Sequence, residues 1–214
     1  MRKISAILLR LALFLLLLPA LPGMAQDMRR PAPPERPEVW FAPLDSVANY
    51  AQGGERDFMS LFSNQAAWSN ALSRIDVMKF YSAFVDQASD DQLRTVVQFL
   101  NAHNIKIAVE TWVLHHGANG CGLQPKGDNI EGYLPKGRDD LPENIAARIR
   151  RAGGVISYVA IDESYAANKN QYGCHLSDDE AANDVQSILT IYRRYFSNVQ
   201  LGDIENLPGT ETPQ

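Results

Sequence analysis

The chain has 214 residues, of which 20 are basic and 25 acidic, and its formal net charge is −5 at pH 7. Nucleic acids and anionic membranes are bound through clustered lysine and arginine, so this balance excludes both as expected partners. A chain of this length is expected to form one domain.

The first 25 residues have the three parts of a secretory signal. Arg2 and Lys3 form a positive start, a run of Leu, Ala and Phe follows, and the small residues Gly23 and Ala25 precede the expected cleavage point. The apolar run is short for a membrane span, so an uncleaved anchor is only the alternative. Cleavage would leave 17 basic residues against 25 acidic ones, a net charge near −8. We expect the mature chain to be secreted or periplasmic, with no membrane association.

Composition then divides the remainder of the chain. Residues 26–38 carry four prolines among charged side chains, which predicts an extended linker. The folded domain is predicted over residues 39–206, and residues 207–214 read as a flexible tail.

From residue 39 onward, runs of strand-forming residues alternate with helical periodicities. Strands are predicted over residues 39–43, 75–82, 105–112, 155–162 and 198–205. Helices are predicted over residues 57–74, 91–104, 141–154 and 177–196, the last beginning with Ser177 and Glu180 in capping-box spacing. Five strands separated by four helices predict an α/β fold with a parallel sheet and helices packed outside it.

The chain has two cysteines, Cys121 and Cys174. An even number in an exported protein predicts one disulfide, with two free thiols as the alternative. The bond would join the loops that follow the third and fourth strands. The first of these loops, residues 115–133, is long and rich in glycine, as binding loops often are.

Charged and aromatic side chains collect at the carboxyl ends of the strands, where parallel α/β sheets carry their functional groups. In chain order they are Lys79 and Tyr81, Glu110 and Trp112, Asp162 and Glu163, and Asp203 and Glu205. Because strand side chains alternate, residues two apart share a face. On the fourth strand it is less clear which side chains face the site, since alternation places Glu163 on the same face as the apolar Val159 and Ile161. Solvated loop starts, helix caps and a simple pairing of Lys79 with Glu110 are the alternative interpretations.

Crowded carboxylates disfavour joint ionisation, so one tends to keep its proton while another is charged. One protonated and one ionised carboxyl is what glycoside hydrolysis needs, and tyrosine and tryptophan rings can stack on sugars. The pattern predicts carbohydrate as the ligand. The candidate catalytic residues are Glu163, Glu205 and Glu110, and the candidate binding residues are Lys79, Tyr81, Trp112, His115, Asp162 and Asp203.

A metal-dependent hydrolase is a separate hypothesis. His115, His116 and His175 lie in the same loops as these carboxylates, but their spacing matches no motif such as HExxH. Adjacent histidines on an extended loop also point apart. No metal ligand and no other cofactor is therefore predicted.

The segments VWFAPLD, DVMKFY, IAVET, YVAIDES and LGDIE, in this order, resemble exported bacterial TIM-barrel proteins of the glycoside-hydrolase type, over about residues 39–206. In that clan the fourth strand ends in an Asn-Glu pair whose Glu is the acid/base. The resemblance implies this role for Glu163, with Asp162 in place of the Asn. The clan's nucleophile follows the seventh strand, whereas five strands are predicted here, so the resemblance implies an incomplete (β/α)8 barrel with Glu205 as the best remaining partner.

An incomplete barrel has two open sheet edges, which invite pairing with another chain. The sheet could be closed by a second copy in a homo-oligomer, stand as an open α/β sheet, or belong to a truncated relative of a longer enzyme. The expected function is that of a glycoside-hydrolase-like protein that acts on carbohydrate through paired carboxylates. A non-catalytic glycan-binding module is the main alternative.

Overall fold

The computed structural model describes residues 36–43 and 54–204. The compact unit that holds the sheet begins at Glu38. The predicted signal, most of the linker, the tail and Glu205 lie outside the described residues. Within the described ranges, none of the helices has both the length and the apolar character that crossing a membrane requires.

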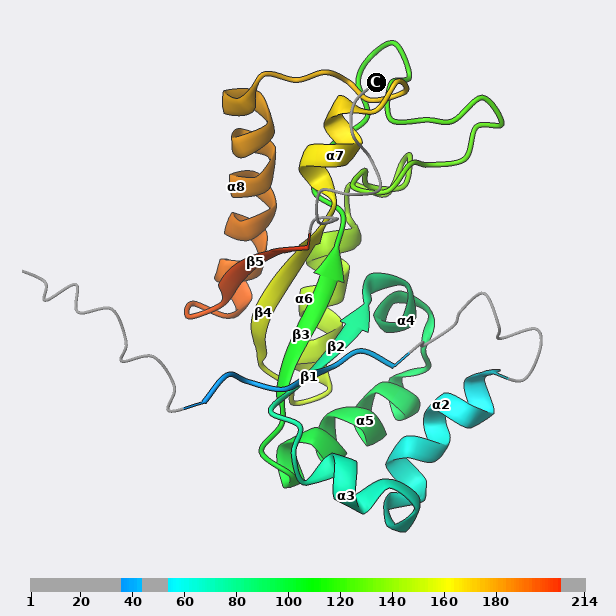
Figure 1. The fold of residues 1–214 in the computed structure, drawn as a ribbon, viewed down its shortest axis with the longest axis vertical. Coiled ribbons are helices and arrows are strands. Elements are labelled where there is room, and N and C mark those ends of the chain that lie inside the picture. Colours follow the sequence, from blue (N-terminus) through cyan, green and yellow to red (C-terminus); the bar gives the residue numbers. More distant parts are fainter. Residues whose placement is uncertain (1–35, 44–53, 205–214) are drawn as a thin grey trace, which may run out of the picture. The chain divides into compact units, whose positions relative to one another are not determined.

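Five parallel strands form one sheet in the order β1-β2-β3-β4-β5 (Figure 1). They are β1 (Trp40–Phe41), β2 (Val77–Tyr81), β3 (Lys106–Thr111), β4 (Ile156–Asp162) and β5 (Gln200–Ile204). Each strand pairs with the next one in sequence, so the order never reverses as it does in a doubly wound sheet. The prediction of an α/β fold built from parallel βα repeats in the manner of an incomplete barrel is confirmed.

Helices connect the strands. They are α2 (Gly54–Ser63), the 3-10 turn Gln65–Trp68, α3 (Ser69–Leu72), α4 (Ser82–Gln87), α5 (Asp90–Ala102), α6 (Leu141–Arg151), α7 (Ser164–Lys169) and α8 (Asp178–Tyr195). Helix α6 packs against α4, α5 and α8, so helices of successive repeats are neighbours. The capping box at the start of α8 is confirmed, because Ser177 Oγ accepts from the Glu180 amide and the Glu180 carboxylate accepts from the Ser177 amide.

Two predictions about helices were wrong. The single helix predicted over residues 57–74 is broken at Asn64, whose φ of −120° and ψ of 60° lie outside the helical region. Helices α4 and α7 were not predicted, because a segment of six residues is too short to show a helical period.

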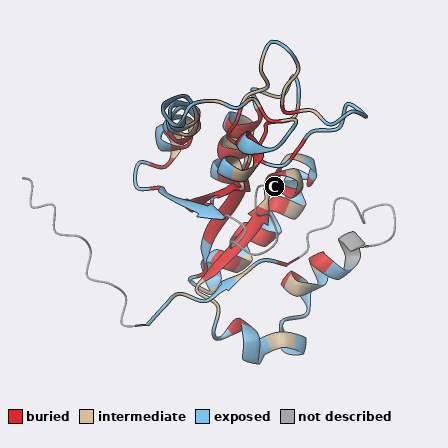
Figure 2. Ribbon diagram, turned by 45° about the horizontal axis from the view of Figure 1, so that its top comes forward, coloured by how far each residue is buried: buried red, intermediate tan, exposed pale blue. Residues whose placement is uncertain are grey.

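The core lies between the sheet and the helices. Met78, Phe80, Val109 and Val159 are fully buried on three neighbouring strands, and the apolar stripe of α5 is buried as well. Figure 2 shows the contrast between the buried strands β2 to β4 and β5, all five of whose residues are exposed.

A register shift decides which side chains of β4 face away from the helices. Ile107 pairs with Ile156 but Ala108 pairs with Tyr158, so Ser157 is an extra residue in β4. Beyond this bulge, Tyr81 lies level with Glu110, and Glu110 lies level with Ala160. Asp162, two residues after Ala160, therefore lies on the same face of the sheet as Glu110. We call it the open face.

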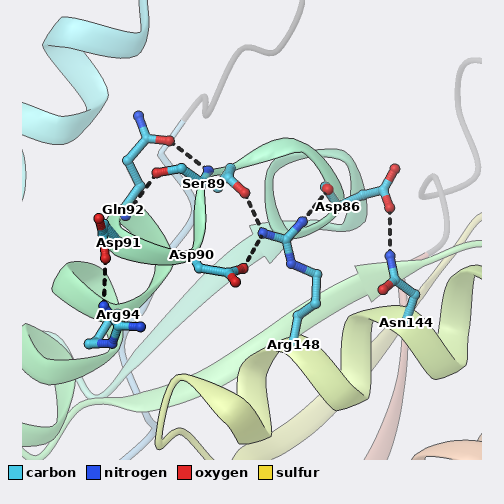
Figure 3. Close-up of polar contacts among 9 residues, drawn as sticks. Asp86, Ser89, Asp90, Asp91, Gln92, Arg94, Asn144 and Arg148 are labelled. Atoms are coloured by element: carbon cyan, nitrogen blue, oxygen red, sulfur yellow. Dashed lines mark hydrogen bonds and ion pairs between the residues drawn. The ribbon is translucent and has the colours of Figure 1, made fainter.

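A polar cluster ties the junction of α4 and α5 to α6. Both Asp86 carboxylate oxygens accept from Arg138 at 3.0 Å, and Asp86 Oδ1 also accepts from Asn144 at 2.8 Å. Arg148 donates to the backbone carbonyls of Asp86 and Ala88, as Figure 3 shows together with the Asn144 contact. The Arg138 hydrogen bonds hold the pKa of Asp86 below its ordinary value.

Candidate functional site

The open face carries a buried ion pair between neighbouring strands. Lys79 Nζ contacts Glu110 Oε2, with the two side chains only 10% and 11% exposed. The ammonium also lies 4.2 Å from the centre of the Tyr81 ring. Burial raises the pKa of Glu110, and the hydrogen bond from Lys79 opposes that rise. The predicted alternative, a pairing of Lys79 with Glu110, is confirmed, and it positions both side chains beside Tyr81.

The pKa of Asp162 is raised well above that of an ordinary aspartate. Its side chain is 8% exposed. Burial raises its pKa to about 8, assisted by a hydrogen bond with Glu131 and by the negative charges of Glu110, Glu131 and Glu163. A hydrogen bond between two carboxyl groups requires a proton on one of them, and burial of Asp162 favours the neutral form there.

Glu163 turns the chain out of β4 in a left-handed conformation, with φ 46° and ψ 34°. This region is costly for a residue with a side chain and is often found where function requires it. Its backbone N–H donates to the Ile204 carbonyl at 2.9 Å, and its own carbonyl accepts from Ala167 at 2.8 Å. The turn is thus held by β5 on one side and by α7 on the other.

A small cleft lies beside this turn. Its volume is about 160 Å³, and it is lined by Gln124, Ile130, Glu131, Glu163, Ala166, Ala167 and Asn170. Ordinary ligand pockets measure roughly 300–1,000 Å³, so the cleft suits a small group such as one unit of a larger ligand. Glu131, Glu163 and the two amide side chains give it a polar lining.

Glu131 was not predicted as a site residue. It lies in the glycine-rich loop after β3, which was recognised as a binding loop but offered no reason to choose one carboxylate in it. The residue that follows, Gly132, has φ +85°, and a Cβ there would lie 2.6 Å from the Ala167 Cβ. A glycine at a close contact marks the place where this loop meets α7.

The predicted disulfide between Cys121 and Cys174 is present, with Cα atoms 4.9 Å apart. It joins the loops that follow β3 and β4, as expected. Gly117 packs beside it, since an added Cβ there would lie 2.3 Å from Cys121 Sγ.

The remaining predicted residues are placed differently. Trp112 is half-buried against the core. His115 contacts α8 rather than the carboxylates, because its Nδ1 lies 3.2 Å from Asp184 Oδ1 and its backbone N–H donates to Asp184 Oδ2. A role for His115 beside the strand-end carboxylates therefore has no contact to support it within the described residues.

The expectation that Asp203 contributes to the same face as the other strand ends is wrong. Asp203 lies level with Ile161, and Ile161 lies level with Thr111. Val109 and Val159 belong to the same row and are fully buried in the core, so this row of residues faces the helices. The bulge at Ser157, invisible to a simple alternation of residues, decides which row of β4 and β5 faces which side.

The histidines do not converge on a metal centre. His116 Nε2 lies 3.1 Å from the Gly122 carbonyl, and the His175 backbone N–H donates to the Asn168 carbonyl at 3.2 Å. Within the described ranges, no three or more His, Cys, Asp or Glu side chains are arranged to hold a metal ion.

A larger hollow, of about 410 Å³, lies at the opposite ends of β4 and β5. Polar groups that line it are engaged with neighbouring side chains. Lys106 and the Tyr158 hydroxyl both bind Glu38, and the Tyr195 hydroxyl donates to Glu143 at 3.0 Å. The raised pKa values of the carboxylates instead mark the carboxyl ends of the strands as the chemical site.

Fold and site together define an α/β protein with an incomplete barrel and a cluster of carboxyl groups at its strand ends. No protein-family model and no curated protein matches the chain. It is similar to the solved structure of a D-psicose 3-epimerase in the presence of D-fructose, with a TM-score of 0.41 and 9% identity. The match covers 67% of this chain and 45% of the epimerase chain, so this protein spans less than half of that relative. No residue role is carried over from a likeness at this level.

Proposed function

We propose that this protein acts on carbohydrate as a glycoside-hydrolase-like enzyme, with the Asp162–Glu131 pair as the proton source. The observation that carries the proposal is the hydrogen bond between buried Asp162 and Glu131 beside the cleft that Glu131 and Glu163 line. Cleavage of a glycosidic bond needs an acid for the leaving oxygen and an ionised carboxylate for the other step. The cluster offers a carboxyl of raised pKa, Asp162, next to two further carboxyl groups, Glu131 and Glu163.

Each carboxyl then has a distinct role. Asp162 stores the proton in the buried position, and exposed Glu131, which borders the cleft, passes it to the leaving oxygen. Glu163 is the second carboxylate, acting as nucleophile or as base toward water. Once the Asp162–Glu131 pair has given up its proton, two neighbouring carboxylates repel each other. This repulsion favours the uptake of a proton from the attacking water. The products are a new hydroxyl on the leaving sugar and a new hydroxyl at the anomeric carbon.

Lys79 and Tyr81 complete the site from β2. Because Lys79 is committed to Glu110, the pair has no net charge and leaves the excess negative charge on Glu131 and Glu163. A site of this charge favours neutral sugars over acidic ones. The Tyr81 ring, partly exposed next to the pair, offers a face for a sugar ring.

The test is a panel of neutral glycans, assayed for new reducing ends with the native chain and with Asp162→Asn, Glu131→Gln and Glu163→Gln. We expect at least a hundredfold loss of turnover in each of the three, because each removes a proton donor or a carboxylate. Asp139→Asn, an exposed aspartate in the loop before α6, is the matched control and keeps native activity. Equal activity in Glu163→Gln and the native chain would remove Glu163 from the mechanism.

The small volume of the cleft favours a second candidate, a glycan-binding module without turnover. Calorimetry on the same panel separates the two. Heat of binding with no new reducing ends would support the binding module, and the absence of both would contradict each candidate.

A further inference from the structure

The loop after β3 (residues 112–140) and the segment after β4 (residues 163–177) are joined side by side. The Cys121–Cys174 disulfide is the covalent link. Next to it, the Gly122 N–H donates to the Tyr172 carbonyl at 2.6 Å, and the Cys174 N–H donates to the Tyr133 hydroxyl at 2.7 Å. We call these contacts the loop seam.

The seam continues to Glu131. The Tyr133 ring is fully buried and packs against Gly122, where an added Cβ would lie 2.5 Å from the ring. One residue earlier, Gly132 packs against the start of α7, with Ala167 and Ser164 in close contact. The packing of Gly132 therefore fixes the backbone next to Glu131 relative to the end of β4.

Asp162 immediately precedes the segment on the other side of the seam. It is held by β4, whose hydrogen bonds to β3 and β5 do not depend on the loops. The charged groups that face Asp162 are Glu110 from β3, Glu131 from the loop and Glu163 from the following turn. Of these, Glu131 alone is carried by the loop after β3, whose backbone is tied at Gly132 to the end of β3 by hydrogen bonds from the Val113 and Leu114 N–H groups, at 3.1 and 2.9 Å.

We propose that the loop seam, with Cys121–Cys174 and Gly132 as positioning residues, holds Glu131 against Asp162 and so maintains the hydrogen bond between the two side chains. Loss of the disulfide removes the covalent part of the seam and loosens the hydrogen bonds beside it, and Glu131 moves away from Asp162. Asp162 then loses a neighbouring negative charge and a hydrogen-bond acceptor, and its affinity for the proton falls. The catalytic meaning of this inference rests on the proposed function, but the positioning itself does not.

The test measures the titration of Asp162 by carboxyl ¹³C NMR in four proteins: native, Cys121→Ser/Cys174→Ser, Glu131→Gln, and the combination of all three substitutions. We expect the double serine variant to bind the Asp162 proton at least tenfold more weakly than the native protein. In the Glu131→Gln background the same serine substitutions should produce no further change, because the group that the seam positions is already neutral.

Two results would overturn the proposal. An unchanged Asp162 titration in the double serine variant would mean that Glu131 stays in place without the disulfide. An equal weakening in both backgrounds would mean that the disulfide stabilises the fold in general rather than positioning Glu131. Neither readout needs a substrate, so a protein without glycan activity still gives a clear answer, and the failure of the proposed function is seen separately.

If the serine variant does not fold, the native protein is reduced in its folded state with excess phosphine. This reagent breaks the S–S bond, leaves two thiols and becomes a phosphine oxide with oxygen from water. Gly132→Ala provides an independent perturbation of the same seam with the disulfide intact. A tenfold weaker Asp162 proton in either sample supports the proposal, and a native titration in both contradicts it.

Discussion

Replacement of Asp162 by asparagine should make the protein more stable at neutral and alkaline pH, although it removes a residue of the candidate site. Asparagine has nearly the same shape and can still donate a hydrogen bond to Glu131. What it lacks is the carboxyl whose pKa rises from 3.8 to about 8 on folding. The effect should therefore depend on pH in a defined direction.

The sign follows from proton binding. Because the pKa of Asp162 is higher in the folded state, the folded protein binds the proton more tightly between pH 3.8 and 8. The free energy of unfolding of the native chain is thus highest below this range and falls as the pH rises through it. A rise of about four pH units at ~1.4 kcal/mol each gives a loss on the order of 5 kcal/mol across the range, most of it already present at pH 7.

The assay is urea unfolding of the native chain and Asp162→Asn at several pH values between 4 and 9. We expect similar midpoints at pH 4 and a higher midpoint for the variant at pH 8 to 9. With a urea slope of about 1–3 kcal/mol/M, the midpoints should differ by more than ~1 M there. Asp139→Asn, an exposed aspartate that is not among the groups acting on Asp162, should follow the native curve. A difference between native and Asp162→Asn that is the same at pH 4 and pH 9 would refute the reasoning, because it would mean that Asp162 ionises normally.

Three further predictions concern stability and the strained turn. Lys79→Met should lower the free energy of unfolding by about 3–5 kcal/mol, because it leaves Glu110 buried without its cation. Adding Glu110→Gln to this variant should restore most of the lost stability in the same urea assay. Asp86→Asn should lower the free energy of unfolding by about 1–3 kcal/mol at pH 7, because its bonds to Arg138 are weaker. Since the pKa of Asp86 is lowered in the folded state, this loss should disappear as the pH falls below that pKa. A loss that persists in acid would contradict an ion pair between Asp86 and Arg138. Glu163→Gly should raise the free energy of unfolding by about 1 kcal/mol, because glycine adopts the left-handed conformation without strain, and it should abolish glycan turnover. A destabilised Glu163→Gly would show that the turn is not strained.

Local sequence signals predicted most of the architecture. The alternation of apolar runs with helical periodicities located all five strands, and the capping box at Ser177 located the start of α8. These signals act over a few residues, so they can be read without knowing what packs against them. The helix over residues 57–74 shows the limit, because the break at Asn64 leaves the apolar spacing on either side unchanged.

The candidate site was predicted only in outline. The strand-end position of Glu110 and Asp162 and the pairing of two loops by cysteines followed from the order of elements. Glu131 could not be chosen, because its importance comes from the packing of Gly132 against α7, a contact between residues 35 positions apart. The face of Asp203 could not be predicted, because it follows from the pairing of β5 with β4, and alternation within β5 alone does not show which row faces the helices.

The sequence by itself determined that the chain alternates strand and helix, that carboxylates end its strands, and that one cross-link joins two of its loops. Those properties reside in composition and short-range spacing. Only the tertiary structure decided that the pKa of Asp162 is raised. That rise depends on how deeply the carboxyl is buried and how many other negative charges approach it, and both are properties of residues brought together from three separate segments.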